Sequence, residues 1–182
     1  MPTFSLLDLQ TPYPSSYGMP WSFHNLIELD VNINSYVKKI IPSRELLQLQ
    51  KLEKITVFSC WEVEEVFETA GRNKNSNCSS GSDFDESSQT TTTTTTTLFN
   101  LQNLREMKLN YLCGLRYIWK SNQWTVFEFP NLTRVDIWGC DRLEHVFTSF
   151  MAGSLLQLQE LRIENCKHIE EVIVKDASRD EI

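Results

Sequence analysis

The stretch LTRVDIWGCDRLEHVF, residues 132–147, is followed 26 residues later by LQELRIENCKHIEEVI, residues 158–173. Both segments place apolar residues at successive steps of three, two, three, three, three and one. The same skeleton begins at residues 26, 52 and 104, with one polar exception, Asn34. An apolar pattern that recurs about every 26 residues predicts a solenoid, in which each repeat stacks on the next. We number these repeats rung 1 to rung 5 along the chain.

Each rung is expected to contribute one short strand, because its only two-residue step suits the alternating side chains of a strand. The strands are predicted at Leu29–Val31, Ile55–Val57, Met107–Leu109, Val135–Ile137 and Leu161–Ile163. The spacing L-x-x-L-x-L-x-x-N/C is that of leucine-rich repeats. We therefore predict an α/β leucine-rich-repeat horseshoe, with a short parallel sheet on the concave face. Its convex face should carry irregular, 3₁₀ and short helical returns, the helical ones near residues 43–49, capped by Ser43, and 150–156.

The chain divides into five segments. Residues 1–22 form a proline-containing, irregular lead-in, and residues 23–68 hold rungs 1 and 2. Residues 69–97 are a Ser, Asn and Thr-rich insertion, residues 98–174 hold rungs 3 to 5, and residues 175–182 form a tail. The insertion is too poor in apolar residues to fold, so we expect it to be disordered rather than a missing repeat. Residues 23–174 should form one domain, taken from a longer array.

Composition narrows the functional class. A net charge of −7 and a pI near 5.0 disfavour binding to nucleic acid. No apolar run reaches the roughly 18 residues of a membrane span, and the first residues do not resemble a signal peptide. Five cysteines cannot all pair with one another, and Cys60, Cys140 and Cys166 share one repeat position. Buried reduced thiols in a cytoplasmic protein are favoured over disulfides between adjacent rungs of a secreted one.

The positions of the histidines and cysteines in the repeats give little support for a catalytic or metal site. The histidines His24, His145 and His168 lie at different repeat positions, so no catalytic pair can be inferred. The pairs Cys140 with His145 and Cys166 with His168 lack the paired spacing of structural zinc sites. No G-x-x-x-x-G-K-[ST] phosphate loop occurs in the sequence. We expect neither an enzyme nor a metal site.

The segments LREMKLNYLCGLRYIW (residues 104–119), LTRVDIWGCDRLEHVF and LQELRIENCKHIEEVI, with a threonine-rich insert between rungs, resemble one family. They are similar to the carboxy-terminal repeats of plant intracellular disease-resistance proteins of the coiled-coil, nucleotide-binding, leucine-rich-repeat type. The resemblance covers residues 23–174. It implies a recognition and regulatory module of innate immunity that binds pathogen effectors or guarded host proteins. It also implies contact with a nucleotide-binding module of the receptor, to which alone ATP or ADP would bind. The alternative is a leucine-rich-repeat substrate adaptor of a ubiquitin ligase.

The candidate protein-binding surface is formed by side chains that alternate with the inward residues of the strands. Across the five strands this outward set contains six acids and four bases, so its charge is mixed. We single out ten residues of it: Lys54, Thr56, Phe58, Lys108, Asn110, Arg134, Asp136, Trp138, Arg162 and Glu164. Aromatic and arginine side chains dominate many protein interfaces, so Trp138 beside Arg134 and Arg162 is the expected centre. The alternative for Trp138 is that it packs across its neighbours in adjacent rungs.

Overall fold

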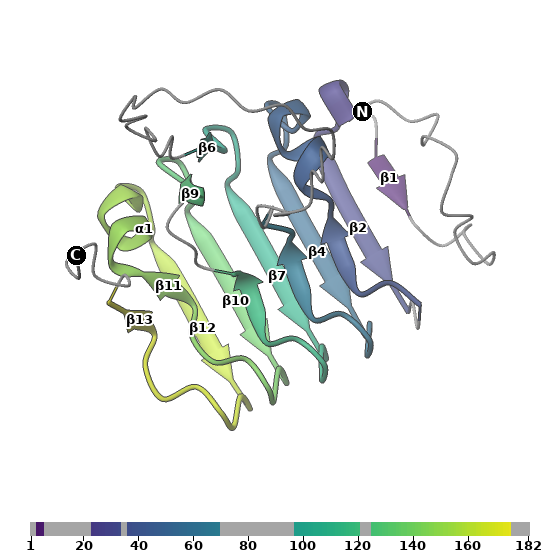
Figure 1. The fold of residues 1–182 in the computed structure, drawn as a ribbon, viewed down its shortest axis with the longest axis vertical. Coiled ribbons are helices and arrows are strands. Elements are labelled where there is room, and N and C mark those ends of the chain that lie inside the picture. Colours follow the sequence, from purple (N-terminus) through teal and green to yellow (C-terminus); the bar gives the residue numbers. More distant parts are fainter. Residues whose placement is uncertain (1–2, 6–22, 34–35, 70–96, 121–124, 176–182) are drawn as a thin grey trace, which may run out of the picture.

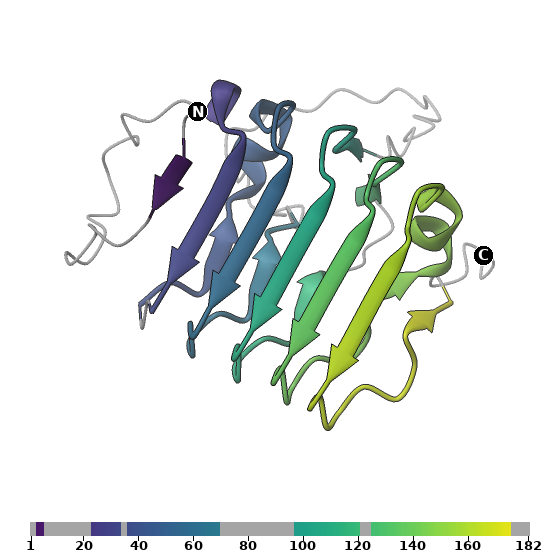
Figure 2. The same ribbon diagram turned by 180° about the vertical axis from the view of Figure 1, so that it is seen from behind.

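The computed structural model describes residues 3–5, 23–33, 36–69, 97–120 and 125–175. Its main element is a six-stranded parallel sheet with strand order β1-β2-β4-β7-β10-β12 (Figures 1 and 2). The strands are β1 (Thr3–Ser5), β2 (Glu28–Asn32), β4 (Lys54–Phe58), β7 (Glu106–Asn110), β10 (Arg134–Trp138) and β12 (Glu160–Glu164). All five predicted strands are present, and the leucine-rich-repeat solenoid is confirmed.

The rungs stack in register. Lys54 pairs with Glu106, although 52 residues separate them, so rung 3 lies directly on rung 2 with no rung between. The predicted disordered insertion, residues 69–97, lies outside the described residues apart from its ends. Thr97 at one end begins strand β6 (Thr97–Asn100), so regular structure resumes one residue earlier than expected.

Strand β1 was not predicted, because residues 1–22 were expected to be an irregular lead-in. Thr3–Ser5 pairs in parallel with β2, with Phe4 opposite Leu29. A strand edge offers a row of unpaired N–H and C=O groups, and β1 satisfies those of rung 1. The rest of the lead-in lies outside the described residues.

The return side contains more strand than the three-residue steps predicted. β3 (Lys39–Ile41), β5 (Glu65–Phe67) and β8 (Tyr117–Trp119) form a second parallel sheet. Two further parallel pairs are β6 with β9 (Thr125–Glu128) and β11 (Phe147–Thr148) with β13 (Ile173–Val174). Because adjacent rungs bring these segments side by side, backbone hydrogen bonds form between rungs where a single rung shows no strand periodicity.

The helical returns are short. Element η2 (Phe23–Asn25) and element η3 (Ser43–Gln48) are 3₁₀ helices, and α1 (Ser149–Ser154) is an α-helix. The predicted Ser43 cap is wrong: Pro42 holds the capping position without a side-chain bond. The amide of Ser43 instead donates to Glu68, at 3.1 Å from its Oε2. At α1 the Thr148 hydroxyl accepts from the Met151 amide at 3.4 Å.

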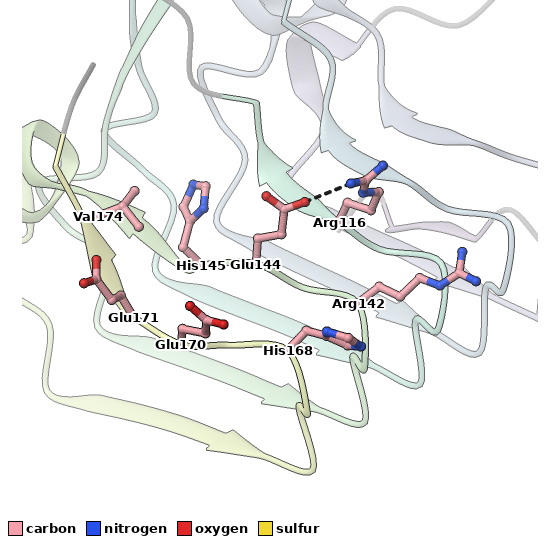
Figure 3. A pocket seen from close by; sticks show the side chains of 8 residues that line it. All are labelled: Arg116, Arg142, Glu144, His145, His168, Glu170, Glu171 and Val174. Atoms are coloured by element: carbon pink, nitrogen blue, oxygen red, sulfur yellow. Dashed lines mark hydrogen bonds and ion pairs between the residues drawn. The ribbon is translucent and has the colours of Figure 1, made fainter. Parts of the chain in front are cut away.

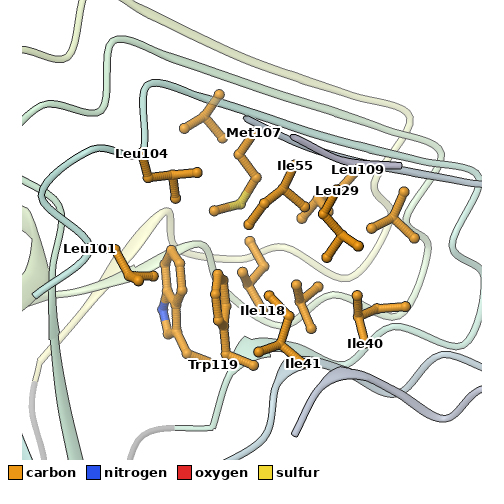
Figure 4. Packing of buried hydrophobic residues seen from close by; sticks show 14 of the residues in the cluster. Leu29, Ile40, Ile41, Ile55, Leu101, Leu104, Met107, Leu109, Ile118 and Trp119 are labelled. Atoms are coloured by element: carbon orange, nitrogen blue, oxygen red, sulfur yellow. The ribbon is translucent and has the colours of Figure 1, made fainter. Parts of the chain in front are cut away.

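The core lies between the main sheet and the return strands (Figure 4). Val135 and Ile137 are 1% and 0% exposed, as the repeat pattern requires. The last skeleton position of each inner rung holds a large aromatic side chain that stacks on its neighbours. Trp119 lies 6.0 Å from Phe67 and 5.7 Å from Phe147 between ring centroids. Phe67, Trp119 and Phe147 are therefore core residues.

Rung 5 departs from the pattern at its outer side. Leu161 and Ile173 occupy skeleton positions but are 39% and 50% exposed. The expectation that every skeleton residue is buried is therefore wrong for this rung. The physical reason is that rung 5 packs on rung 4 alone, and no described residue covers its far side.

Each rung leaves the sheet through a turn with one residue in the left-handed backbone region. These residues are Ile33, Ser59, Tyr111, Gly139 and Asn165, with φ between 46° and 68°. The amide of each of the first four donates to a carbonyl of the next rung, as Tyr111 does to Trp138 at 2.8 Å. The left-handed turn thus orients an N–H group along the solenoid and joins neighbouring rungs.

None of the helices that the structure describes has the length and apolar content needed to cross a membrane.

Candidate protein-interaction surface

The outward residues of the main sheet form three columns that run across the strands, which lie side by side in Figure 2. The strand register places the residues of each column opposite one another. The first column contains Glu28, Lys54, Glu106, Arg134 and Glu160, the second Asp30, Thr56, Lys108, Asp136 and Arg162, and the third Asn32, Phe58, Asn110, Trp138 and Glu164. All ten predicted site residues therefore lie on one face of the sheet.

The first column alternates in charge, and its neighbours form ion pairs. Arg134 reaches Glu160 at 2.8 Å, and Lys54 reaches Glu106 at 3.7 Å. Glu106 also contacts Lys108 at 3.0 Å. Burial acts to raise the pKa of Glu106, but the hydrogen bond from Lys108 and the charges of Lys54 and Arg134 lower it overall. Most charges at this end of the strands are therefore already neutralised within the protein.

In β12, the central residue Arg162 donates from Nε and Nη2 to the two carboxylate oxygens of Glu164 at the other end of the strand, each at 3.0 Å. This hydrogen-bonded pair, together with the charges of Asp136 and Glu160, raises the pKa of Arg162. Arg162 thus presents a guanidinium group held in place by its own strand.

Three aromatic side chains lie together at this end of the sheet. The ring of Tyr111 meets the ring of Trp138 edge-on, with centroids 4.2 Å apart, and that of Phe58 at 5.5 Å. Phe58 and Tyr111 are 37% and 42% exposed, and Trp138 is half-buried. We call these three residues the aromatic row.

The surroundings of Trp138 can be described, whereas its role as a contact centre stays a prediction. It packs across the neighbouring rung, through Tyr111, while its outer side borders solvent. Arg134 does not join it, because the two residues stand at opposite ends of β10. The sequence reasoning missed Tyr111, which follows the strand in the left-handed turn. The signal that was available is an aromatic residue at the turn position that rungs 2, 4 and 5 fill with Ser, Gly and Asn.

A hollow of about 240 Å³ opens beside the aromatic row. Its lining residues are Asn110, Tyr111, Asp136, Trp138 and Arg162. The side-chain oxygen of Asn110 is buried and has no hydrogen-bond partner among the described residues. The hollow thus combines an aromatic wall, a cation, an anion and an unused acceptor, which together suit a polar protein segment with an apolar or aromatic anchor.

A second hollow, of about 670 Å³, lies on the return side across rungs 3 to 5 (Figure 3). Its lining residues are Arg116, Arg142, Glu144, His145, His168, Glu170, Glu171 and Val174. Glu144 accepts from Arg116 at 3.1 Å and from the Tyr117 hydroxyl at 3.0 Å. Burial lowers the pKa of His145, although nearby Glu144 opposes the shift, so this side chain is held neutral.

No cluster of three or more His, Cys, Asp or Glu side chains is placed to hold a metal ion in the described part of the chain. Of the four described cysteines, Cys60 and Cys140 are buried, Cys166 is partly exposed and Cys113 is exposed, and none of these four forms a disulfide.

Comparison with known proteins assigns the family. Residues 9–167 match the family described as plant disease resistance protein RPS2-like, leucine-rich repeats. No curated protein matches the chain, and no solved structure matches it. The match spans all five predicted strands and every lining residue of the smaller hollow, and it covers most of the 182 residues. The chain therefore belongs to the leucine-rich-repeat family of RPS2-like plant disease resistance proteins.

Proposed function

We propose that this chain is the ligand-recognition and regulatory module of a plant innate immune receptor, and that it binds other proteins through the outward face of its main sheet. The partners are pathogen effectors or the host proteins that such receptors guard, together with the nucleotide-binding module of the same receptor. The receptor belongs to the coiled-coil, nucleotide-binding, leucine-rich-repeat class and acts in the cytoplasm. ATP or ADP binds only to the nucleotide-binding module of that receptor. The repeats themselves perform no catalysis.

The observation that carries this proposal is the hollow beside the aromatic row. Four predicted site residues, Asn110, Asp136, Trp138 and Arg162, converge there with Tyr111 from three adjacent strands or their turns. Aromatic and arginine side chains in a partly desolvated pocket are the usual anchors of protein interfaces. The family assignment favours this function over that of a ubiquitin-ligase adaptor. No feature of the described residues supports the adaptor.

The charges of the sheet face indicate which part of it does the binding. Near the start of the strands, the ion pairs of Glu106 and Glu160 with lysine and arginine leave little unpaired charge. Near the end of the strands, the buried side-chain oxygen of Asn110 has no hydrogen-bond partner among the described residues, and Asp136 lines the same hollow. We therefore place the contact at rungs 3 to 5, around Trp138.

Site-specific photo-crosslinking tests the proposal. Benzoylphenylalanine replaces Trp138 in one variant and Glu170, on the return side, in a matched control. Each is expressed in leaf cells within a receptor that contains these repeats, with and without pathogen challenge. Crosslinks to a pathogen or host protein at position 138, absent at position 170, are the expected result. Equal crosslinking at both positions, or none at position 138, would contradict the proposed surface.

A further inference from the structure

Cys140 and Cys166 occupy the same repeat position on adjacent rungs. Two residues before them, Trp138 and Glu164 are direct partners in the parallel pairing of β10 and β12. Neighbouring strands lie about 4.8 Å apart, which falls within the Cα separation of about 4.4–6.8 Å that a disulfide spans. The backbone thus already holds the two cysteines at a distance that a disulfide can bridge.

The two thiols differ in their exposure to solvent. The Cys166 sulfur lies 3.3 Å from the Glu164 carbonyl oxygen. Cys140 is fully buried, with its sulfur 3.4 Å from the Leu109 carbonyl oxygen. Cys166 is partly exposed, because its rung packs on one side only. An oxidant in solution therefore reaches Cys166 first, because the Cys140 sulfur is buried.

We propose that Cys140 and Cys166 are a redox modification site, at which a peroxide produces a disulfide that ties rung 5 to rung 4. Cys166 acts as the peroxide-reactive residue and Cys140 as the resolving residue. This arrangement, a partly exposed thiol beside a second cysteine, is the one typical of cysteines that oxidise reversibly.

The chemistry proceeds in two balanced steps. The Cys166 thiolate attacks one peroxide oxygen, the O–O bond breaks, and the departing hydroxide takes up a proton to become water. Cys166 is then a sulfenic acid. The Cys140 sulfur attacks the Cys166 sulfur, an S–S bond forms and the S–O bond breaks, and the hydroxyl leaves with the Cys140 proton as water. Two thiols lose two electrons, and one peroxide is reduced to two waters.

The electrostatics of the pair support this division of roles. The neighbouring Cys140 thiol favours the Cys166 thiolate and lowers the pKa of Cys166 to about 7, further helped by the amides of Cys140 and Gly139 and opposed by burial. The same interaction, followed by burial, raises the pKa of Cys140. Once Cys166 is a neutral sulfenic acid, the negative acceptor that held the Cys140 proton is gone, and Cys140 can act as a nucleophile.

Other cysteines provide internal controls. Cys60 shares the repeat position, but Leu112 separates it from Cys140 in the column, so it has no cysteine on the adjacent rung 3 at that position. Cys113 is exposed and follows Leu112 directly in the sequence, one position out of step with the column. Accessibility alone would favour oxidation of Cys113, whereas the proposal requires Cys166.

The test is peptide mapping of the reduced 182-residue chain after treatment with hydrogen peroxide. Remaining thiols are blocked with N-ethylmaleimide, and trypsin then releases VDIWGCDR (residues 135–142) and IENCK (residues 163–167). The expected product is these two peptides joined by a disulfide, lighter by two hydrogens than their sum. It should be restored to separate thiol peptides by dithiothreitol.

Two variants sharpen the test. Cys60→Ser should leave the linked peptide unchanged, and Cys166→Ser should remove it and leave Cys140 fully reactive toward N-ethylmaleimide after unfolding. Recovery of Cys166 as sulfinic or sulfonic acid with Cys140 still a thiol would overturn the proposal, as would linkage of Cys166 to Cys113 or Cys78. The wild-type map decides the question even if a variant folds poorly.

Discussion

The ring of Tyr111 meets the ring of Trp138 edge-on with centroids 4.2 Å apart, joining rung 3 to rung 4 on the outward face of the sheet. An edge-to-face pair contributes about 0.5–1.5 kcal/mol beyond the area it buries. The same two side chains form one wall of the hollow at Asn110 and Arg162. The contact between Tyr111 and Trp138 thus contributes both to the stability of the fold and to the proposed binding hollow. Measurements of unfolding can determine its contribution to stability alone.

The first prediction concerns this aromatic pair. Tyr111→Ala, Trp138→Ala and the double variant should show a coupling free energy of about 1 kcal/mol in a double-mutant cycle. The measurement is urea denaturation followed by circular dichroism. Tyr117→Ala with Trp138→Ala is the control pair, because Tyr117 lies on the return side and its effect should simply add. A coupling near zero for Tyr111 and Trp138 would show that the rings do not support one another.

A second prediction concerns Gly114. A Cβ at this position would overlap the carbonyl oxygen of Trp61 in the rung below, and that oxygen belongs to the backbone. Gly114→Ala should therefore destabilise the protein by about 2–3 kcal/mol, as overpacking typically does. Gly153→Ala is the control, because open space surrounds Gly153 and alanine favours the α-helix there. The two melting temperatures should move in opposite directions, and a small effect of Gly114→Ala would show that the rungs can spread at little cost.

A third prediction concerns the left-handed turns. Ser59 has a φ of 54°, which favours glycine, and its amide donates to Asn110 at 3.0 Å. Ser59→Gly should raise the free energy of unfolding by about 0.5 kcal/mol, because relief of strain exceeds the entropy that glycine loses on folding. Gly139→Ala, at a φ of 68° with no severe clash, should lower it by about 1 kcal/mol. Changes of the same sign in both variants would contradict this account.

The repeat pattern predicted the parts of the fold that follow from contacts between rungs. The two-residue step located the strand that each of the five rungs adds to the main sheet, and the inward residues of rungs 2 to 4 are buried because each has a neighbour on both sides. The return strands were not predictable in the same way. Their pairing, such as Lys39 with Glu65, depends on contacts with an adjacent rung, and a three-residue step shows no alternation within one rung.

The surface was predictable only in outline. Alternation along a strand placed all ten candidate residues on one face, since register carries each outward position to the next rung. Whether they touch depends on side-chain direction, which the pattern does not contain. Tyr111 joins the group because its ring, from the left-handed turn after β7, packs against Trp138. Arg134 stands apart because it lies at the opposite end of β10, where it pairs with Glu160. The role of the ten residues in binding stays a prediction.

A fourth prediction concerns pH. The hydrogen bond from Lys39, at 2.6 Å, lowers the pKa of Glu68, with the Ser43 amide assisting and burial opposing. Because the folded-state pKa is depressed, the stabilisation is complete above the unfolded value of about 4.5 and is lost as the pH falls below it. Solvent screens this partly exposed pair, so its contribution is about 0.5–1 kcal/mol.

Glu68→Gln should therefore be less stable than the wild type at pH 7, and the difference should shrink as the pH falls below 4.5 and disappear below the lowered folded-state pKa of Glu68. Lys39 has a raised pKa for the same reason, so the difference should also shrink at strongly alkaline pH. Glu64→Gln is the matched control, because the 3.4 Å pair of Glu64 with Lys38 is well exposed on both sides. A pH-independent difference for Glu68→Gln would show that the effect is not electrostatic.

The last prediction compares Met107 with Leu161, which occupy the same skeleton position on rungs 3 and 5. Met107 is 0% exposed between two rungs, whereas Leu161 is 39% exposed on the far side of rung 5. Met107→Ala should cost about 2–5 kcal/mol, because it leaves a cavity in a packed core. Leu161→Ala should cost about 1 kcal/mol or less, since the truncated side chain was half in water and leaves no closed void. Guanidinium denaturation of both variants measures the difference. If Leu161→Ala lowered the free energy of unfolding as much as Met107→Ala, another molecule or segment would cover rung 5 in solution. Leu161 would then be buried as completely as the residues of the inner rungs.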